Sequence, residues 1–458
     1  MAGPAAAKTV TWGSRLSFIM ASVGAAVGLG NFWRFPYTAG ENGGGAFVGV
    51  YLICMLVIAV PLVLTELMIG RRARHSAVGS ARQLSVEATG KPTWAIIGWL
   101  GMSATFLIVT FYSVIGGWVI NFTVEGFTNG YATSVEEAGA VFDNLLADPW
   151  RLTLYHTLFM IITVAIPAQG VKGGIERAVN VLMPALFLLL FGLMVYGMFS
   201  SGFSEGVAYM FSFDFTKITP DVVLAATGQA FFSVGVGMAI LITYGAYLDK
   251  TTNLVEAGLI VSLADTGVAI MAGLVIFPIV FTYGLDPAGG PGLIFVTLPV
   301  AFAQMGFGGA LGSVFFLLIL VAAITSSIAI IEITVSWAED KGYDRKKSAI
   351  ISGFIIWLLG FGTVFSFNEW SNFFPLGFIG LFEGKTIFDA LDFITGQFML
   401  TSGGLLLAIF GGWILSAEVV CEEFGWRPGS IMFVAYRVMC RFIIPPVIGT
   451  MIISVLIG

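Results

Sequence analysis

Charged residues are scarce in this chain, and histidine and cysteine are scarcer still. Of its 458 residues only 10% are charged, and the formal net charge is −6. No basic stripe lies beside aromatic residues, so the sequence argues against nucleic-acid binding. His75 and His156 are too far apart in sequence to indicate a metal site. Cys54, Cys421 and Cys440 have no metal or redox spacing.

Recognisable enzyme motifs are also missing. We find no Ser–His pair, metal motif or nucleotide loop, so we expect that the protein is not an enzyme. The first ten residues lack the apolar stretch and cleavage pattern of a signal peptide. The chain instead has 57% hydrophobic residues, 58 glycines and a mean hydropathy of +0.94. This composition is typical of a membrane protein in which glycines allow close helix packing.

Apolar runs of about 20 residues predict an all-α polytopic membrane protein with eleven transmembrane helices. The fourth run is short, and the first and sixth are interrupted. The expected spans are 14–39, 45–70, 95–122, 153–169, 178–200, 221–248, 256–284, 303–337, 348–366, 388–417 and 432–457.

Basic residues predict the orientation of these spans. One side of the topology holds only Arg151, Lys217 and Lys385, and Arg34 lies inside the first span, so the other 17 of the 21 Lys and Arg share one side. Because basic loops stay in the cytoplasm, we expect segment 1–13 to be cytoplasmic and the C-terminus extracellular.

The first span contains GAAVGLGNFWRFP at 24–36, with three glycines, an Asn and an Arg. Each glycine inside a helix costs about 1 kcal/mol relative to Ala, and an Arg at membrane depth costs at least about 2.5 kcal/mol. This pattern predicts a helix broken in mid-membrane, with backbone groups available to a ligand or ion.

The sixth span repeats this pattern, since Gly228, Gly235 and Gly237 cluster within it. It opens a second five-helix unit, 221–417, as the first span opens 14–200, and 432–457 is the eleventh helix. Two five-helix units insert with opposite orientation, and interrupted helices at matching positions indicate the binding site of a transporter. The alternative is that these glycines only pack helices.

These residues resemble the neurotransmitter:sodium symporter family, specifically its bacterial amino-acid transporters with the LeuT-type fold. The resemblance covers nearly the whole chain, and its matching stretches are 12–16, 24–36, 41–47, 229–247 and 325–330. It implies a 5+5 inverted repeat with discontinuous first and sixth helices, although relatives commonly have twelve spans. It also implies sodium-coupled symport by alternating access across the bacterial inner (plasma) membrane, with the amino acid, Na⁺ and the lipid bilayer as the expected partners and no obligatory protein partner.

The resemblance implies two Na⁺ sites built from oxygen ligands. One would use the carbonyls of Gly24, Val27 and Ala322 with the hydroxyls of Thr325 and Ser326. The other would use the Ala26 carbonyl, Asn31, Ser233 and Asp265, together with the substrate carboxylate.

Asp265 departs from the family pattern, in which Asn is usual at this position. Chloride-dependent relatives place a chloride ion nearby, and many bacterial relatives place a glutamate four residues further along, where this chain has Ala269. We therefore expect Asp265 to supply the negative charge and chloride not to be required. The alternative is an Asp that is permanently protonated and paired with a polar helix neighbour.

The substrate carboxylate is expected at the amides of Leu29 and Gly30, assisted by the Tyr112 hydroxyl. Amine-transporting relatives have Asp where this chain has Gly28, which favours an amino acid that carries its own carboxylate. Ala26 and Ser233 would border it. The side-chain pocket is expected to be lined by Ile108, Ile115, Phe232, Gly235, Met238, Ser326 and Ile330. These residues are not ionisable, so we expect neutral hydrophobic L-amino acids, aromatic ones included.

Two gates follow from the resemblance. Arg34 would pair with Asp392 near Tyr112 and Phe232, with Gln229 beside Arg34. On the cytoplasmic side Asp340, or the adjacent Glu339, would pair with Lys8, which Trp12 would anchor. The fifth span, with Gly173, Gly174 and Pro184, is expected to unwind at its inner end or, alternatively, to hold a static kink. A transporter of another small zwitterion such as betaine, an amino-acid sensor and a channel are the alternative functions.

Overall fold

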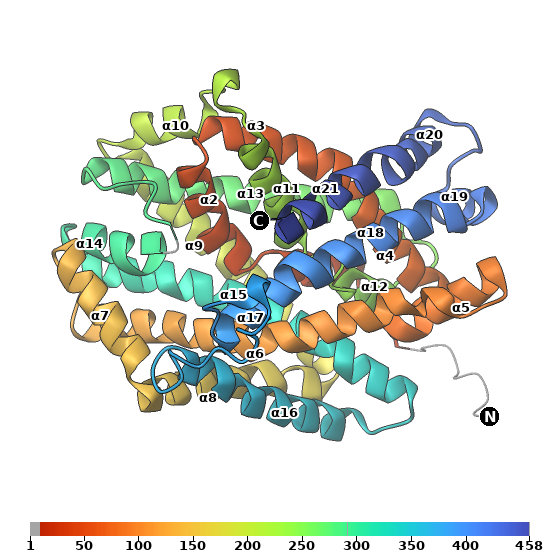
Figure 1. Cartoon of the computed structure of the whole chain (residues 1–458), viewed down its shortest axis with the longest axis horizontal. Helices are drawn as coiled ribbons and strands as arrows, with labels where there is room; N and C mark the ends of the chain where they lie inside the picture. Colours follow the sequence, from red (N-terminus) through yellow and green to blue (C-terminus); the bar gives the residue numbers. More distant parts are fainter. Residues whose placement is uncertain (1–9, 291, 458) are drawn as a thin grey trace.

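The computed structural model describes residues 10–290 and 292–457, and all regular elements in these residues are helices. The long helices run roughly along the longest axis of the molecule (Figure 1). One end carries α5 (Ala77–Thr89), α19 (Ala417–Phe424) and the start of α20 (Ile431–Val438), and we call it the α5 end. The opposite end carries α7 (Val135–Ala147), α10 (Phe203–Phe211) and α14 (Leu298–Ala303), and we call it the α10 end.

Within the described residues, nine continuous helices are long and apolar enough to cross a membrane. Several of them contain short π or 3₁₀ segments (η) between their α-helical parts. Their bounds are Gly45–Ala73 (α3, Gly45–Cys54; η2, Met55–Ala59; α4, Val60–Ala73), Thr93–Thr128 (η3, Thr93–Ala95; α6, Ile96–Thr128), Pro149–Gln169 (α8, Pro149–Ala165; η4, Pro167–Gln169), Val171–Met198 (η5, Val171–Glu176; α9, Arg177–Met198), Leu254–Thr282 (α13), Gly308–Asp340 (α15), Arg345–Ser366 (α16), Ile387–Ile414 (α17, Ile387–Phe393; η9, Ile394–Leu400; α18, Thr401–Ile409; η10, Phe410–Ile414) and Ile431–Leu456 (α20; η11, Met439–Ile443; α21, Ile444–Ile457).

The predicted first span is a broken helix. α1 (Arg15–Ala26) begins at Ser14, whose hydroxyl accepts the Ser17 N–H, and it ends at Val27, which is extended (φ −71°, ψ 107°). The chain then continues through the π segment η1 (Gly30–Arg34) into α2 (Phe35–Glu41). The two halves are bent by 51° relative to each other. Together they add one broken apolar span to the nine continuous ones.

The predicted sixth span consists of two short helices, α11 (Pro220–Val234) and α12 (Ile240–Gly245). Gly235 and Gly237 between them have φ of +69° and +83°, the left-handed region that glycine adopts without a Cβ penalty. Ala239 also has a positive φ, +60°, which a residue with a Cβ adopts less readily. The glycine cluster of the sixth span therefore marks a backbone break.

Three predicted boundaries differ from the observed ones by five residues or more. The third span was expected to end at 122, but α6 ends at Thr128. The eighth span was expected from 303, but α15 begins at Gly308 after Phe307, whose φ is +62°. The fifth was expected from 178, but its helix begins at Val171. The chain accommodates Lys172 and the two glycines that follow it in the π segment η5. The spans from α17 and α20 agree with the expected positions to within a few residues.

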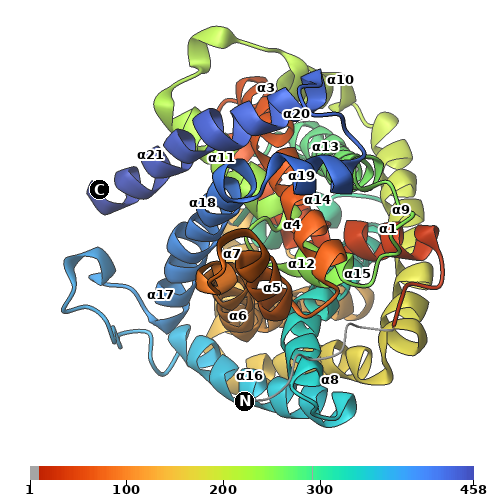
Figure 2. The ribbon, with the colours of Figure 1, turned by 90° about the vertical axis from the view of Figure 1, so that its right-hand side faces the viewer.

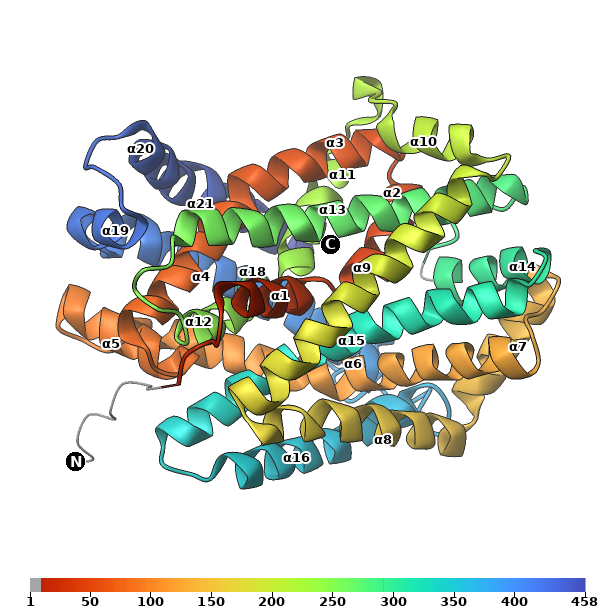
Figure 3. The same ribbon diagram turned by 180° about the vertical axis from the view of Figure 1, so that it is seen from behind.

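The two broken spans lie in the interior of the bundle. Seen from the α5 end, α4 and α12 lie between α1, α15 and α6 (Figure 2), and the reverse view shows α1 crossed by α9 (Figure 3). α4 and α12 pack with their backbones in contact, because a Cβ on Gly245 would lie 2.9 Å from the Leu67 carbonyl oxygen and one on Gly70 would overlap the Ile242 carbonyl. The fold thus places two interrupted helices, whose backbone groups at the breaks bond to side chains of other elements, among continuous ones.

Candidate functional site

Oxygen atoms from α1 and α15 meet where the first span breaks. The Ser326 hydroxyl donates to the carbonyls of Gly24 and Val27, at 3.2 and 3.0 Å. The Thr325 hydroxyl donates to the carbonyls of Val321 and Ala322, at 3.1 and 3.0 Å. A Cβ on Gly24 would lie 3.2 Å from the Thr325 Cβ, so the two helices touch here. The structure brings these predicted ligands together as a buried cluster of carbonyl and hydroxyl oxygens, the donor type that suits a hard cation.

A second cluster joins three elements through Asn31, Ser233 and Asp265. Asn31 Nδ2 donates to Asp265 Oδ1 at 2.7 Å and to the Asp265 carbonyl at 3.1 Å. The Ser233 hydroxyl donates to Asp265 Oδ2 at 2.7 Å. Asn31 Oδ1 in turn accepts the Gly28 N–H at 2.9 Å, which ties the cluster to the break of the first span. Ala26, the remaining predicted ligand, lies buried at the end of α1.

Asp265 is fully buried, yet only neutral groups contact its carboxylate. Among the described residues, no Lys, Arg or His nitrogen lies within 4.0 Å of it. A buried carboxylate without a cationic partner is unfavourable, so it must bind a cation or a proton. Either a bound cation or a bound proton would neutralise this carboxylate.

The backbone amides that follow the first break face Tyr112 on α6. The Tyr112 hydroxyl accepts the Leu29 N–H at a long 3.4 Å. A Cβ on Gly28 would lie 2.7 Å from Ser326 Oγ and 3.1 Å from the Tyr112 hydroxyl. A carboxylate side chain would therefore not fit at position 28 in this arrangement.

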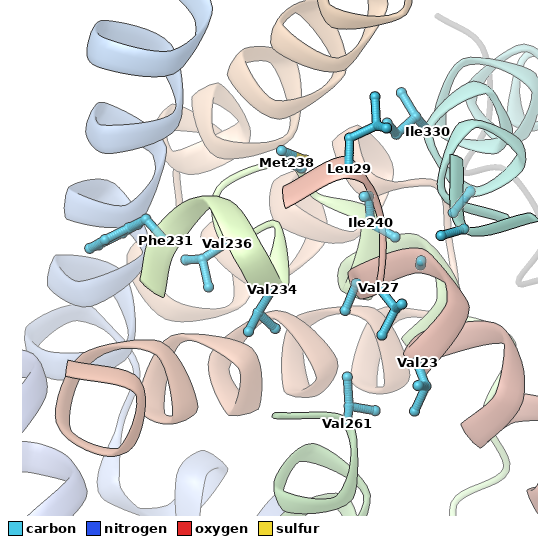
Figure 4. Packing of buried hydrophobic residues seen from close by; sticks show 14 of the residues in the cluster. Val23, Val27, Leu29, Phe231, Val234, Val236, Met238, Ile240, Val261 and Ile330 are labelled. Carbon is cyan, nitrogen blue, oxygen red and sulfur yellow. The ribbon is translucent and has the colours of Figure 1, made fainter. Parts of the chain in front are cut away.

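Apolar side chains surround both breaks. Figure 4 shows Val27 and Leu29 from the first break with Val236 and Met238 from the second, and Ile330 from α15. Ile108, Ile115, Met238 and Ile330 are buried, and Phe232 is half-buried. A Cβ on Gly235 would lie 3.2 Å from Met238 Sδ, so a larger residue there would press on Met238. The predicted pocket residues thus lie on the elements that flank the breaks.

The predicted outer gate is only partly assembled. The Arg34 guanidinium lies 4.6 Å above the Phe232 ring, and Gln229 Nε2 donates to the Gly30 carbonyl at 2.9 Å. Asp392 is exposed, and its carboxylate is not within 4.0 Å of Arg34, both residues being in the described part of the chain. Arg34 therefore contacts an aromatic ring rather than the expected carboxylate.

At the predicted inner gate, Trp12 is held by the end of the sixth span. Its indole N–H donates to the Tyr244 carbonyl at 3.1 Å, and its backbone N–H donates to the Tyr247 carbonyl at 3.2 Å. Asp340 accepts the Ser76 N–H and lies 4.0 Å from His75 Nδ1. Lys8, the predicted basic partner, lies outside the described residues.

Two buried carboxylates were not among the predicted site residues. Glu66 on α4 accepts the N–H groups of Gly237 at 2.8 Å and Leu241 at 3.2 Å, so it fills the second break. Glu332 on α15 accepts the Tyr247 hydroxyl at 2.7 Å and pairs with Arg345. Both are lone acids inside apolar runs, a signal that by itself indicates a functional or structural role in a membrane.

The family model and the relatives that match this chain all belong to one family of transporters. The model of the sodium:neurotransmitter symporter family matches residues 9–138 and 133–457. An uncharacterised sodium-dependent transporter of Bacillus subtilis, YhdH, is 36% identical over 96% of each chain. An uncharacterised sodium-dependent transporter of Haemophilus influenzae is also 36% identical, over 97% of each chain.

A solved structure supports the fold over the same length. The crystal structure of MhsT in complex with L-phenylalanine matches with a TM-score of 0.86 and 41% sequence identity, over 98% of this chain and 100% of that one. Together with two broken spans that meet at buried oxygen clusters, these matches show that the chain belongs to the sodium:neurotransmitter symporter family, and that it is a sodium-dependent membrane transporter of the LeuT-type fold, not an enzyme.

Proposed function

We propose that this transporter couples the entry of two Na⁺ ions to uptake of a neutral hydrophobic or aromatic L-amino acid. The observation that carries this proposal is the meeting of the first break with Asp265, Asn31 and Ser233. A substrate carboxylate at the Leu29 and Gly30 amides would lie at the N-terminal end of η1 and α2, where the helix dipole is positive. It would also lie next to this cation site. The same ion would then contact both protein and substrate, which couples their binding.

The substrate class follows from what surrounds the amides. Gly28 leaves no acidic partner for a bare amine, and the predicted pocket side chains are apolar apart from the Ser326 hydroxyl. A charged substrate side chain would be buried without a partner, which is costly. Gly235 and the flexible Met238 leave room for large side chains. The L-phenylalanine bound by MhsT is a substance of this class.

Asp265 is the residue that would make chloride unnecessary. Its carboxylate supplies one negative charge inside the proposed cation site, so a Na⁺ bound there is neutralised by the protein itself. The second ion would bind the carbonyls of Gly24, Val27 and Ala322 with the hydroxyls of Thr325 and Ser326. We further propose alternating access, with the α5 end in the cytoplasm of a bacterium.

Uptake across reconstituted liposomes tests this function. With a Na⁺ gradient and each of the twenty labelled amino acids, plus labelled betaine, we expect concentrative uptake of Phe, Trp, Tyr and Leu. A zwitterion carried with two Na⁺ moves two charges, about 4.6 kcal/mol at 100 mV, which allows roughly thousandfold accumulation. Uptake of betaine, glycine or dicarboxylates alone would contradict the proposed substrate, and uptake independent of Na⁺ would contradict the coupling.

A further inference from the structure

A cavity lies outside the functional site, between the end of the tenth span and the start of the eleventh. Its volume is about 450 Å³, and residues of η10, α20 and η11 line it. In Figure 1, α19 and the start of α20 lie at the α5 end. Its lining, which falls wholly within the described part of the chain, contains Arg437 and Arg441 and no acidic residue. A cavity of this size and charge suits a small anionic group.

Arg437 brings a buried positive charge to this cavity. The residue is only 6% exposed, and its Nη atoms donate to the carbonyls of Gly411, Gly412 and Leu415 at 2.6–2.9 Å. These bonds satisfy the carbonyls that end η10. Nε of Arg437, however, is buried without a hydrogen-bond partner. The guanidinium is thus fixed in position by neutral groups, and no acidic side chain among the described residues forms an ion pair with it.

Arg441 and the start of α19 add further donors. Arg441 Nε donates to the Gly412 carbonyl at 2.5 Å, while its Nη groups have no hydrogen-bond partner among residues 10–290 and 292–457. Ser416 and Ala417 also line the cavity, and they form the N-terminal end of α19. A helix N-terminus carries a partial positive charge and favours anions. The Ser416 hydroxyl accepts the Val419 N–H and Glu418 is acidic, so the two arginines supply most of the positive potential of the cavity.

The mouth of the cavity faces the apolar surface of the bundle. Trp413 and Phe442, whose ring centroids are 6.2 Å apart, are 46% and 65% exposed. Val434 and Val438, which also line the cavity, are 47% and 41% exposed. Aromatic residues of this kind mark the level of lipid headgroups in membrane proteins. These exposed apolar residues would let the acyl chains of a lipid lie beside the mouth of the cavity.

We propose that this cavity binds the phosphate of an anionic phospholipid. Arg441 Nη and the first N–H groups of α19 would donate to the phosphate oxygens, and Arg437 would supply the unscreened charge behind them. The acyl chains would lie against Val434, Val438 and Phe442. Basic cavities between membrane helices are a known way to hold anionic headgroups, and a lipid here would hold the tenth and eleventh spans together.

Native mass spectrometry of the full-length protein in detergent tests this proposal. Titration with phosphatidylglycerol should show one tight lipid, retained at about tenfold lower concentration than phosphatidylcholine. Arg441→Gln should weaken phosphatidylglycerol binding about tenfold, since it removes a charge-assisted hydrogen bond. Arg427→Gln, an exposed residue of the preceding loop with the same charge change, is the matched control and should bind as the unmodified protein does.

A second variant guards against misfolding of Arg441→Gln. Val434→Trp keeps both arginines and changes no charge, and it should abolish the tight lipid by filling the cavity. Equal binding by Arg441→Gln and Arg427→Gln, or equal retention of the two lipids, would overturn the proposal. So would displacement of phosphatidylglycerol by millimolar inorganic phosphate, because the site would then be one for a soluble anion. These readouts do not depend on transport, so they stand apart from the proposed substrate.

Discussion

At the scale of single residues, Asp265 is the group on which the proposed ion coupling depends. Asp265→Asn keeps the volume of the side chain but removes its negative charge and places an amide opposite Asn31 Nδ2. We expect Na⁺-dependent uptake either to be lost or to become responsive to chloride, which would restore the missing charge. The measurement is uptake in proteoliposomes with chloride or gluconate as the anion.

Asp286→Asn is the matched control for this prediction, since Asp286 is exposed and accepts the neighbouring Ala288 N–H. It should leave uptake unchanged in both anions. If Asp265→Asn keeps the full Na⁺ dependence and rate in chloride-free buffer, Asp265 does not carry the charge of the cation site.

Glu66 is a second residue with a testable role, because it accepts two N–H groups of the second break. Glu66→Gln replaces one accepting oxygen by an NH₂ group that would face a backbone N–H. Leaving a buried donor unsatisfied costs about 1–3 kcal/mol, so the variant should melt at a lower temperature and transport more slowly.

Thermal unfolding followed by intrinsic fluorescence checks the prediction for Glu66. Glu418→Gln, an exposed glutamate of α19, serves as the control and should melt as the unmodified protein does. A Glu66→Gln protein of unchanged melting temperature would show that the break does not depend on this carboxylate.

Some residues of the proposed site could be predicted from the sequence, and others could not. The resemblance selects Asn31, Ser233 and Asp265, which come from three distant segments and lie in hydrogen-bond contact. Glu66 could have been found as a lone acid in an apolar run, but its partners are backbone N–H groups that carry no sequence signal. The contact of Arg34 with Phe232 depends on the side-chain conformation, which residue types alone do not predict.

At the scale of elements, the fifth span gives a prediction about movement. Its inner end is helical here, with η5 (Val171–Glu176) leading into α9, and Pro184 lies inside α9. Glu176 accepts the Gly13 N–H at 3.0 Å, and a Cβ on Gly24 would meet Met183 Sδ at 2.7 Å, so this segment covers the first break.

Because π segments and prolines lack regular helix hydrogen bonds, we expect this end to unwind when Na⁺ is removed. Single cysteines at 175–183 should then react faster with a water-soluble maleimide in Na⁺-free buffer than in Na⁺. Cysteines at 188–196, further along the same helix, should react equally in both. Equal rates at 175–183 would indicate a static kink.

The sequence predicts an element when the physical cause of that element requires particular residue types. Glycine clusters mark the breaks at Val27 and Gly235, because backbone freed from a helix in a membrane needs residues that tolerate it. The π segments in the second, tenth and eleventh spans depend on packing and have no comparable signature. The short helix α14 lies between the expected seventh and eighth spans, and its apolar run is too short to suggest a span.

At the scale of the whole molecule, ligand binding should appear as stability. Both proposed cation sites join helices from distant parts of the chain, α1 with α15 and η1 with α11 and α13. An ion bound only by the folded state at a hundred times its Kd adds about 2.7 kcal/mol. We therefore expect NaCl to raise the melting temperature, and phenylalanine to raise it further only when Na⁺ is present.

Choline chloride at equal ionic strength is the control for this titration and should have little effect. A rise of the same size with choline, or a phenylalanine effect that does not need Na⁺, would contradict linked binding of ion and amino acid at one site.

The backbone contact between α4 and α12 has a practical consequence for measurements on this protein. Gly70 and Gly245 bring the two helices so close that they cannot slide or separate without losing the fit. A pair of spin labels on these two helices should therefore report one unchanging separation in every state of the transport cycle. Such a pair would give a constant reference distance. Any change in distance measured between α1 and α15 could be compared with it in the same sample.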